Sequence, residues 1–366
     1  MSLHGRRRVW RCALLLLLLL GVATLVAWRV RRQERALSEP VVRYSTHELP
    51  LRKYQGPFRT PPFAPVANLA PRDPEGCLVF VTRTSSLTKV RRTMFDVEQR
   101  FNYRFRYPYI FLGEHSFSPE FQVAVRYASS GSVRFGLADD WWEGSAAPWA
   151  SRMERYWAAP FARHPALAGC RFAWRLEPGS HHTCDVDQDP FALMRSRNLS
   201  YAFAVTYDAP PEPSPARLLP LLAHALNGSS RTNSLSWLWN ADSHGATMRC
   251  QFLTNSELVD LHFVRSREYQ DMFAAVDRGE GGLDGQWSDV SLRSLAVASL
   301  LDQRQVAWLD GAGYTHDDLH NCPGTTHRQM QCHCDPNTST HLRSPCATHW
   351  TTAAIQINET SIATVI

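Results

Sequence analysis

The segment 175–191, RLEPGSHHTCDVDQDPF, concentrates side chains that could do chemistry. Glu177 stands on a Pro-Gly turn, two histidines and a cysteine follow, and three aspartates come at alternate positions. A carboxylate on such a turn can hold a hard divalent cation, which neutralises a departing diphosphate. The simpler interpretation is that Asp185, Asp187 and Asp189 only cap the helix predicted in PFALMRS.

A second candidate site is the CHCDP segment, where His327, Cys332, His333 and Cys334 stand close together. Structural zinc sites usually contain cysteine pairs two to four residues apart, whereas this pair is separated by one residue. An even set of cysteines in an oxidising compartment favours disulfides instead. The eight cysteines that follow residue 28 are Cys77, Cys170, Cys184, Cys250, Cys322, Cys332, Cys334 and Cys346. Eight cysteines allow 105 pairings, so the sequence leaves their connectivity open.

The compartment is indicated by the N-terminus. Residues 12–28 form an uncharged apolar run with seven consecutive leucines, long enough for one membrane span. No clear cleavage site follows, which favours an uncleaved anchor with a cytoplasmic tail at 1–11; a cleaved signal peptide is the alternative. The cysteines and four N-x-S/T sequons, at Asn198, Asn227, Asn337 and Asn358, favour a lumenal body.

The basic charge of the chain belongs to the flanks of this run. Residues 1–35 contain eight Arg and one Glu, which leaves 31 Lys and Arg against 33 Asp and Glu, a formal net charge of −2. We therefore expect no nucleic-acid partner. Residues 29–74 are rich in proline and predict an extended lumenal stem. One domain of residues 75–350 and a C-terminal tail of 351–366 complete the predicted organisation.

The body alternates between strand and helix patterns. Apolar β-rich runs predict strands at 77–82, 108–113 and 132–136, with helices beginning at Ser85 or Ser86 and after the cap Ser118. This order predicts a parallel sheet covered on both faces. Further strands are expected at 171–177, 201–206 and 250–254, and further helices at 269–276 and 292–300. Ligands of such sheets bind beyond the carboxyl ends of the strands, which is where Glu177 falls.

Residues 77–334 resemble the fungal α-1,2-mannosyltransferases of glycosyltransferase family 15, which are of the yeast Kre and Ktr type. The chain resembles a divergent member of that family. The matching phrases include FDVEQRFNYRFRYPYIFLGEHSFSPEF, WRLEP, CDVDQDPF, NSELVDLHFVRSREYQDMF, LDGAGYTH and CHCDP, in the same order. The resemblance implies an α/β fold, a GT-A-like Rossmann-type nucleotide-sugar transferase domain behind the anchor. It also implies mannose transfer from GDP-mannose with retention of configuration, using Mn²⁺.

The family's site residues fall on four positions of this sequence. Its metal ligands fall on Glu177 and His316, and a carboxylate with an imidazole suits Mn²⁺ better than Ca²⁺. A nucleotide-binding position falls on Arg83. The family's reacting-face carboxylate falls on Glu257, either to form a covalent mannosyl intermediate or only to stabilise oxocarbenium-like charge.

The departures from the family also concentrate at the site. The aspartate of its Glu-Pro-Asp motif is Gly179, a donor-site tyrosine falls on or near Ala150, and a late-helix histidine is Arg293. Its Ser-Gly pair becomes Ala158 and Ala159. We expect His181 and His182 to be exposed loop histidines rather than replacement metal ligands. Arg293 either lies on a helix surface or pairs with donor phosphate.

The resemblance therefore predicts a single-span type II protein of the Golgi membrane. Its lumenal domain would transfer mannose from GDP-mannose to mannose-terminated N- or O-linked glycans of glycoproteins, as in cell-wall mannoprotein synthesis. Possible partners are other Golgi mannosyltransferases in a complex. One alternative is a weak or inactive relative that binds glycan or partner glycosyltransferases. Another is an enzyme with a changed donor or acceptor.

Overall fold

The structure is a computed structural model, and it describes residues 75–138, 147–209, 235, 238, 250–278, 287–324 and 331–357. The expected tail, membrane span and stem lie outside these residues. Within the described ranges, no helix combines the length and the apolar character that crossing a membrane requires.

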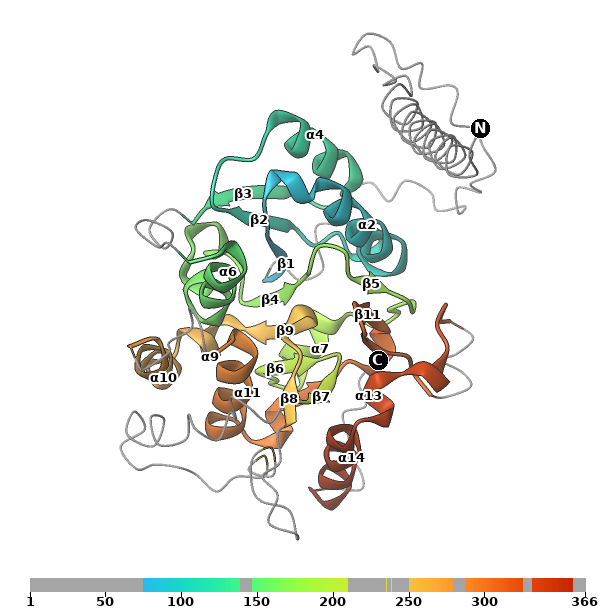
Figure 1. Ribbon diagram of the computed structural model, residues 1–366. Coiled ribbons are helices and arrows are strands. Elements are labelled where there is room, and N and C mark those ends of the chain that lie inside the picture. Colours follow the sequence, from blue (N-terminus) through green and yellow to red (C-terminus); the bar gives the residue numbers. More distant parts are fainter. Residues whose placement is uncertain are drawn as a thin grey trace, which may run out of the picture. The chain divides into compact units, whose positions relative to one another are not determined.

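A seven-stranded sheet forms the centre of the domain, in the order β10-β6-β9-β4-β1-β2-β3 (Figure 1). Its strands are β1 Gly76–Val81, β2 Tyr109–Gly113, β3 Val133–Leu137, β4 Phe172–Arg175, β6 Tyr201–Phe203, β9 Glu257–Asp260 and β10 Val306–Trp308. Strands β1 to β4 pair in parallel, as predicted, but β9 lies antiparallel between β4 and β6. The predicted parallel arrangement is confirmed for the first three strands. Strand β9 was not predicted, because its four residues are all buried and show no alternation, and its antiparallel pairing makes the sheet mixed.

The helices of the described residues are α2 Leu87–Val97, α3 Tyr103–Phe105, α4 Pro119–Ala128, α6 Trp149–Ala158, α7 Pro190–Ser196, α9 Leu261–Arg265, α10 Arg267–Arg278, α11 Asp289–Leu300, α13 Thr340–Arg343 and α14 Pro345–Ile357. Half of these helices were predicted, namely α2, α4, α7, α10 and α11. The predicted cap is present, since the Ser118 side chain accepts from the Phe121 N–H and Pro119 opens α4. The five-residue π-helical segment Glu98–Asn102 joins α2 to α3.

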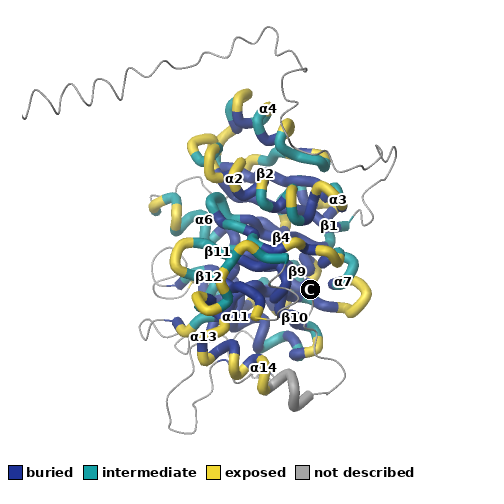
Figure 2. The backbone as a smooth tube through the Cα atoms, turned by 90° about the vertical axis from the view of Figure 1, so that its right-hand side faces the viewer, coloured by how far each residue is buried: buried dark blue, intermediate teal, exposed yellow. Residues whose placement is uncertain are grey.

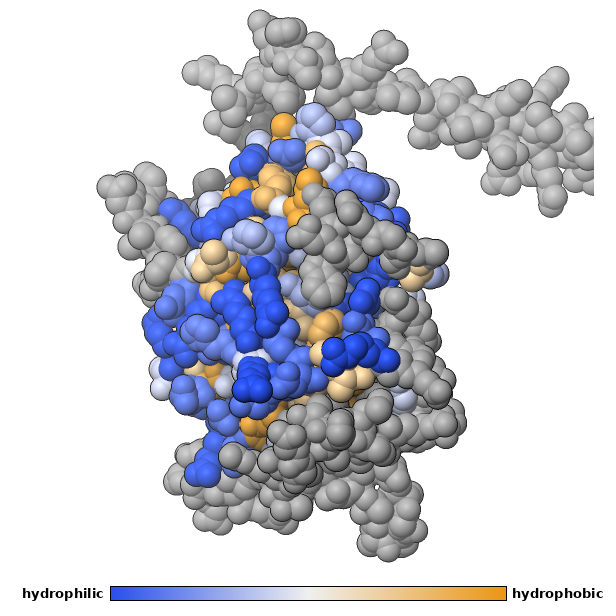
Figure 3. Space-filling view, turned by 90° about the vertical axis from the view of Figure 1, so that its left-hand side faces the viewer, coloured by the Kyte–Doolittle hydropathy of each residue, from blue (hydrophilic) through white to orange (hydrophobic). Residues whose placement is uncertain are grey.

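Two apolar layers cover the sheet, one on each face. Alternate residues of β1 show the division, with Cys77, Val79 and Val81 in one layer and Leu78 and Phe80 in the other. Residues of α6, α9, α10 and α11 complete the first layer, and residues of α2, α4 and α7 complete the second (Figure 1). The inner strands are accordingly buried, whereas helices such as α2 and α4 keep exposed outer faces (Figure 2). Helix α11 is an exception, because none of its residues is exposed. On the side that carries α6 and α10, the described surface is mostly hydrophilic (Figure 3).

Two smaller sheets lie beside the central one. The predicted strand 201–206 is divided, because its second part continues as β7 Thr206–Asp208, which pairs with β8 Cys250–Phe252. A three-stranded sheet joins β12 Leu319–Asn321, β11 Tyr314–His316 and β5 His181–His182. Helix α14 runs through the expected boundary at 350, and Trp350 packs edge-on against Phe203 at 4.9 Å between ring centroids.

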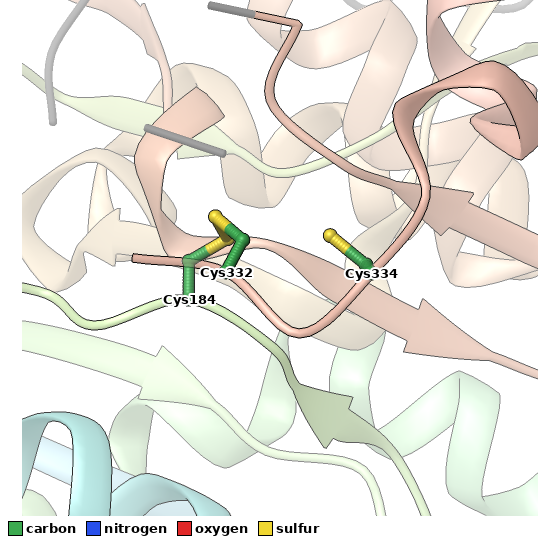
Figure 4. Close-up of side chains that lie close together, drawn as sticks. All are labelled: Cys184, Cys332 and Cys334. Atoms are coloured by element: carbon green, nitrogen blue, oxygen red, sulfur yellow. A yellow bond between two sulfur atoms is a disulfide. The ribbon is translucent and has the colours of Figure 1, made fainter. Parts of the chain in front are cut away.

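All eight cysteines that follow the apolar run form disulfides, which confirms that interpretation of the CHCDP segment. The pairs are Cys77–Cys170, Cys184–Cys332, Cys250–Cys346 and Cys322–Cys334. Figure 4 shows the bond between Cys184 and Cys332, with Cys334 apart from it. The zinc alternative is wrong because these sulfurs are already covalently paired.

Candidate active site

The carboxyl ends of the parallel strands bring several charged side chains to one edge of the sheet. Arg83 follows β1, and its guanidinium lies over the indole ring of Trp149 at 4.3 Å from the ring centroid. Glu114 follows β2 and forms an ion pair of 2.6 Å with Arg152. Because Trp149 and Arg152 both belong to α6, this helix runs along the edge at which α/β sheets bind their ligands.

Arg175, the last residue of β4, is the centre of a buried polar cluster. Its side chain is only 3% exposed, and its guanidinium lies over the Trp157 ring at 4.5 Å from the centroid. One amino group forms a short ion pair with Asp289. The other lies 3.5 Å from Glu177 Oε2 and 3.4 Å from Asn255 Oδ1. Sequence reasoning missed this arginine, although an arginine that ends an apolar strand beside Glu177 was an available signal.

The Pro-Gly turn on which Glu177 stands is fixed by α2. The Ser180 N–H donates to the Glu177 carbonyl at 3.0 Å, and Gly179 has a φ of +95°. A proline followed by a residue with positive φ is typical of a type II turn. The Thr93 hydroxyl contacts the Glu177 and Ser180 carbonyls at 3.2 and 2.9 Å and accepts from the Gly179 N–H at 3.0 Å. The glycine is therefore suited to the turn, at the position where the family has its aspartate.

His316 joins the same cluster through Asn255. Its Nδ1 lies 3.2 Å from Asn255 Nδ2, and Asn255 also contacts Arg175, which contacts Glu177. The side chains of Glu177 and His316 are 14% and 21% exposed, so solvent reaches both. The two predicted metal ligands thus belong to one connected cluster, although they are distant in sequence.

The protonation of these two ligands follows from their surroundings. Burial raises the pKa of Glu177, and the positive charge of Arg175 opposes that rise. Burial lowers the pKa of His316, which favours the neutral imidazole that metal coordination needs. An anionic oxygen and a neutral imidazole nitrogen are a donor set that suits Mn²⁺, so these residues fit the metal that the resemblance implies.

His181 and His182 were expected in an exposed loop, and that expectation was wrong. They form β5, which pairs with β11. His182 is buried between Trp174 and Tyr314, and burial lowers its pKa to about 3, so it stays neutral. His181 points the other way, and its Nδ1 lies 2.7 Å from an Asp96 carboxylate oxygen on α2. Neither ring replaces the aspartate of the family's motif.

Among the described residues, one group of three potential metal ligands lies close together, namely Cys184, Cys332 and Cys334. Disulfides occupy these sulfurs. The candidate metal site therefore depends on the two side chains of Glu177 and His316, and a bound diphosphate would have to supply further oxygen ligands.

Glu257 and Arg293 form an ion pair in the interior, with Arg293 Nε 3.0 Å from Glu257 Oε2 and side-chain exposures of 1% and 0%. The expectation that Arg293 lies on a helix surface was therefore wrong. It does not reach a donor phosphate either, because its guanidinium also donates to the Tyr269 hydroxyl and the Trp157 carbonyl. The catalytic role expected of Glu257 remains a prediction, but its carboxylate faces an arginine rather than an open site.

The three aspartates after Cys184 have structural partners, but the prediction that they cap the helix is confirmed for Asp189 alone. Asp189 caps α7, accepts from the Phe191 and Ala192 N–H groups, and also accepts from the Tyr107 hydroxyl at 2.7 Å. The other two form ion pairs instead of caps, Asp185 with Arg100 at 3.0 Å and Asp187 with Arg104 at 2.8 Å.

A further acidic group near the cluster was missed by sequence reasoning. Glu154 lies on α6 one turn before Trp157, and so on the same face of the helix. Burial, and then the charge of Asp289, raise the pKa of Glu154 to about 7. Four carboxylates, those of Glu154, Glu177, Glu257 and Asp289, thus influence the environment of Arg175.

A mixed α/β fold with these acidic, basic and imidazole groups at its carboxyl edge suits a glycosyltransferase that uses a nucleotide-sugar donor. The sequence profile of the glycolipid 2-alpha-mannosyltransferase family matches residues 52–146 and 144–354, so the chain belongs to this family.

The chain is also similar to several named mannosyltransferases and to solved structures with the same fold. The O-glycoside alpha-1,2-mannosyltransferase homolog 2 of Schizosaccharomyces pombe is 28% identical over 286 residues, 70% of this chain and 75% of that protein. The glycolipid 2-alpha-mannosyltransferase 1 of Candida albicans is also 28% identical, over 71% of this chain and 67% of that protein.

Core-mannan synthase A from Aspergillus fumigatus, solved in a Mn/GDP form, superposes with a TM-score of 0.65 at 25% identity, covering 74% of this chain and 81% of that one. The mannosyltransferase Ktr4p from Saccharomyces cerevisiae in complex with GDP gives a TM-score of 0.68 at 23% identity, covering 79% and 86%.

Proposed function

We propose that this glycosyltransferase transfers mannose from GDP-mannose to the 2-hydroxyl of a mannose-terminated N- or O-linked glycan, with retention of configuration. The observation that carries the proposal is the connected cluster of Glu177, Arg175, Asn255 and His316 at the carboxyl edge of the sheet. Family membership supplies the reaction class, and the relatives' names supply the α-1,2 linkage.

The donor's charge is matched by the side chains at this edge. Glu177 and His316 would hold Mn²⁺, which supplies positive charge that stabilises the departing diphosphate. Arg83, which is exposed beyond β1, contributes to nucleotide binding. Arg175 lies behind Glu177 and orients its carboxylate, because the same guanidinium is held in place by Asp289 and Trp157.

The test is a transfer assay with the full-length protein in detergent, with GDP-mannose as donor and α-mannosides as acceptors. We expect transfer that requires Mn²⁺ and stops with EDTA, and an α-1,2 linkage in the product. Folded protein that transfers to no mannoside would contradict the proposal. It would favour the alternative of a lumenal glycan-binding relative, which is motivated by Gly179 and by the pairing of Glu257 with Arg293.

We also propose a Golgi location with a single span at 12–28 and a lumenal catalytic domain, in a possible complex with other Golgi mannosyltransferases. The disulfides suit an oxidising lumen, and the sequon residues Asn198 and Asn337 are exposed. Endoglycosidase treatment should increase gel mobility, and Asn198→Gln with Asn337→Gln should reduce that shift. A domain without glycan that is digested by protease in sealed vesicles would reverse the orientation.

A further inference from the structure

The C-terminal end of α6 is closed by side chains from two other helices. The Trp157 carbonyl accepts from Arg293 Nη2 of α11 at 3.0 Å, and the Ala158 carbonyl accepts from the Tyr269 hydroxyl of α10 at 2.6 Å. Arg293 Nη1 also donates to that hydroxyl at 2.7 Å, so the two side chains act as one cap. The last carbonyls of a helix have no partners within the helix, and a cation there is favoured by the helix dipole.

The position of Arg293 depends on Glu257. An arginine side chain stays protonated in proteins, and Arg293 is completely buried. A buried charge without a counter-ion is strongly destabilising. Among the described residues, Glu257 is the carboxylate in ion-pair contact with Arg293, and it comes from β9, an inner strand of the sheet. The pair therefore connects the central sheet to the end of α6 through one guanidinium.

Helix α6 in turn places two aromatic rings at the candidate site. Trp149 near its start lies against Arg83, and Trp157 near its end lies against Arg175. A shift of the helix end would move the Trp157 ring directly. Because Arg175 contacts Glu177 and Asn255, that shift would be transmitted to the candidate metal ligands.

We propose that Glu257 and Arg293 form one neutral buried unit that seats α6 against the carboxyl edge of the sheet, so that Glu257 supports donor binding through Arg293 and not by contact with the sugar. Glu257 and Arg293 are then positioning residues. The inference rests on the proposed function, which supplies the donor site. It does not name another carboxylate that would face the reacting sugar in place of Glu257.

The test compares Glu257→Gln, Arg293→Met and the double variant, measuring melting temperature, GDP affinity with Mn²⁺, and kcat and KM for GDP-mannose. Each single variant removes one charge and leaves the other buried, so each should melt earlier and lose GDP affinity and kcat/KM by about tenfold or more. The double variant has no unpaired charge. It should melt above both single variants and recover kcat to within about fivefold of the wild type. Its KM for GDP-mannose should stay raised, because the Trp157 carbonyl no longer accepts from Arg293.

A different result for the double variant would reject the proposal. A double variant that folds and binds GDP but has a kcat as low as that of Glu257→Gln, about a hundredfold below wild type, would show that the carboxylate touches the reacting sugar. Tyr269→Phe is the matched variant if the others fail to fold, because it removes the hydroxyl from the cap and leaves the ion pair intact. It should raise KM for GDP-mannose with little change in kcat, and an unchanged KM would overturn the inference.

The proposed function fails in a different way. If the wild-type protein transfers no mannose, the melting temperatures and the GDP affinities of the four variants still decide whether the pair positions α6. If the wild type is active and the variants show no rescue, the proposed function stands and only the inference about the pair is rejected.

Discussion

The Thr93 hydroxyl lies 3.0 Å from the Gly179 backbone nitrogen, so a buried side chain of α2 fixes the turn that presents Glu177. Thr93→Val keeps the shape of the side chain and removes all three polar contacts with the turn. We expect a loss of about 1–3 kcal/mol in the free energy of unfolding and a weaker Mn²⁺ affinity, because the turn would lose its fixed position. Chemical denaturation and titration of activity with Mn²⁺ measure the two effects. Thr88→Val, on the exposed side of α2, is the control and should change neither.

Gly179→Asp restores the family's motif at a position with a φ of +95°. The space is sufficient, since an added Cβ would meet Lys89 side-chain carbons at 3.5 Å, but the backbone conformation should cost about 1–2 kcal/mol of stability. We expect a lower Mn²⁺ concentration for half-maximal activity, because a second carboxylate enters the cluster. Gly179→Ala carries the same strain without the charge. If both variants show the same Mn²⁺ dependence as the wild type, the turn is not part of the metal site.

Glu177→Gln and His316→Gln test the metal ligands directly. Each should reduce the affinity for GDP in the presence of Mn²⁺ by about tenfold or more, as measured by calorimetry, and should leave the weaker affinity in EDTA unchanged. Both side chains are partly exposed, so the melting temperature should change little. An equal loss of GDP affinity with and without Mn²⁺ would mean that these residues do not act through the metal.

Glu154 should make stability depend on pH. Its pKa is raised from 4.5 to about 7 by burial and by Asp289, so the folded protein holds this proton more tightly than the unfolded chain does. The stabilisation is therefore fully present below about pH 4.5 and is lost as the pH rises through 7. In the wild type the melting temperature should therefore fall between about pH 4.5 and 8, the interval that spans the two pKa values. Glu154→Gln should make this fall smaller, because the amide does not titrate. Parallel curves for the two proteins would exclude the effect.

The aspartates after Cys184 should differ in their contributions to stability. Asp189→Ala removes the cap of α7 and the acceptor for Tyr107, and should cost about 1–2 kcal/mol. Asp187→Asn breaks an ion pair whose partners are 54% and 42% exposed, and should cost less than about 1 kcal/mol. Neither change should alter KM for GDP-mannose. The reverse order of stability, measured by urea denaturation, would contradict the assigned roles.

Much of the fold could be predicted from the sequence because it depends on local periodicity. The spacing of apolar residues predicted α10 within about two residues at each end, α11 within about three, and the start of α2 within about two. The Ser118-Pro119 pair predicted the start of α4. Strand β9 could not be assigned in this way. Its four residues are all buried, and its antiparallel pairing with β4 and β6 depends on contacts between segments distant in sequence.

The sequence by itself determined the class of protein and the disulfide-bonded character of the domain, because these depend on motifs and residue types. It also supplied Glu177 and His316 as the proposed Mn²⁺ ligands. Only the tertiary structure decided which cysteines pair, where His181 points, and that Arg293 is buried against Glu257. Arg293 was expected on a helix surface because arginine is usually exposed, but other helices and strands cover that face of α11. The charge of Arg293 is tolerated there because a strand from elsewhere in the chain brings Glu257 to within 3.0 Å of it.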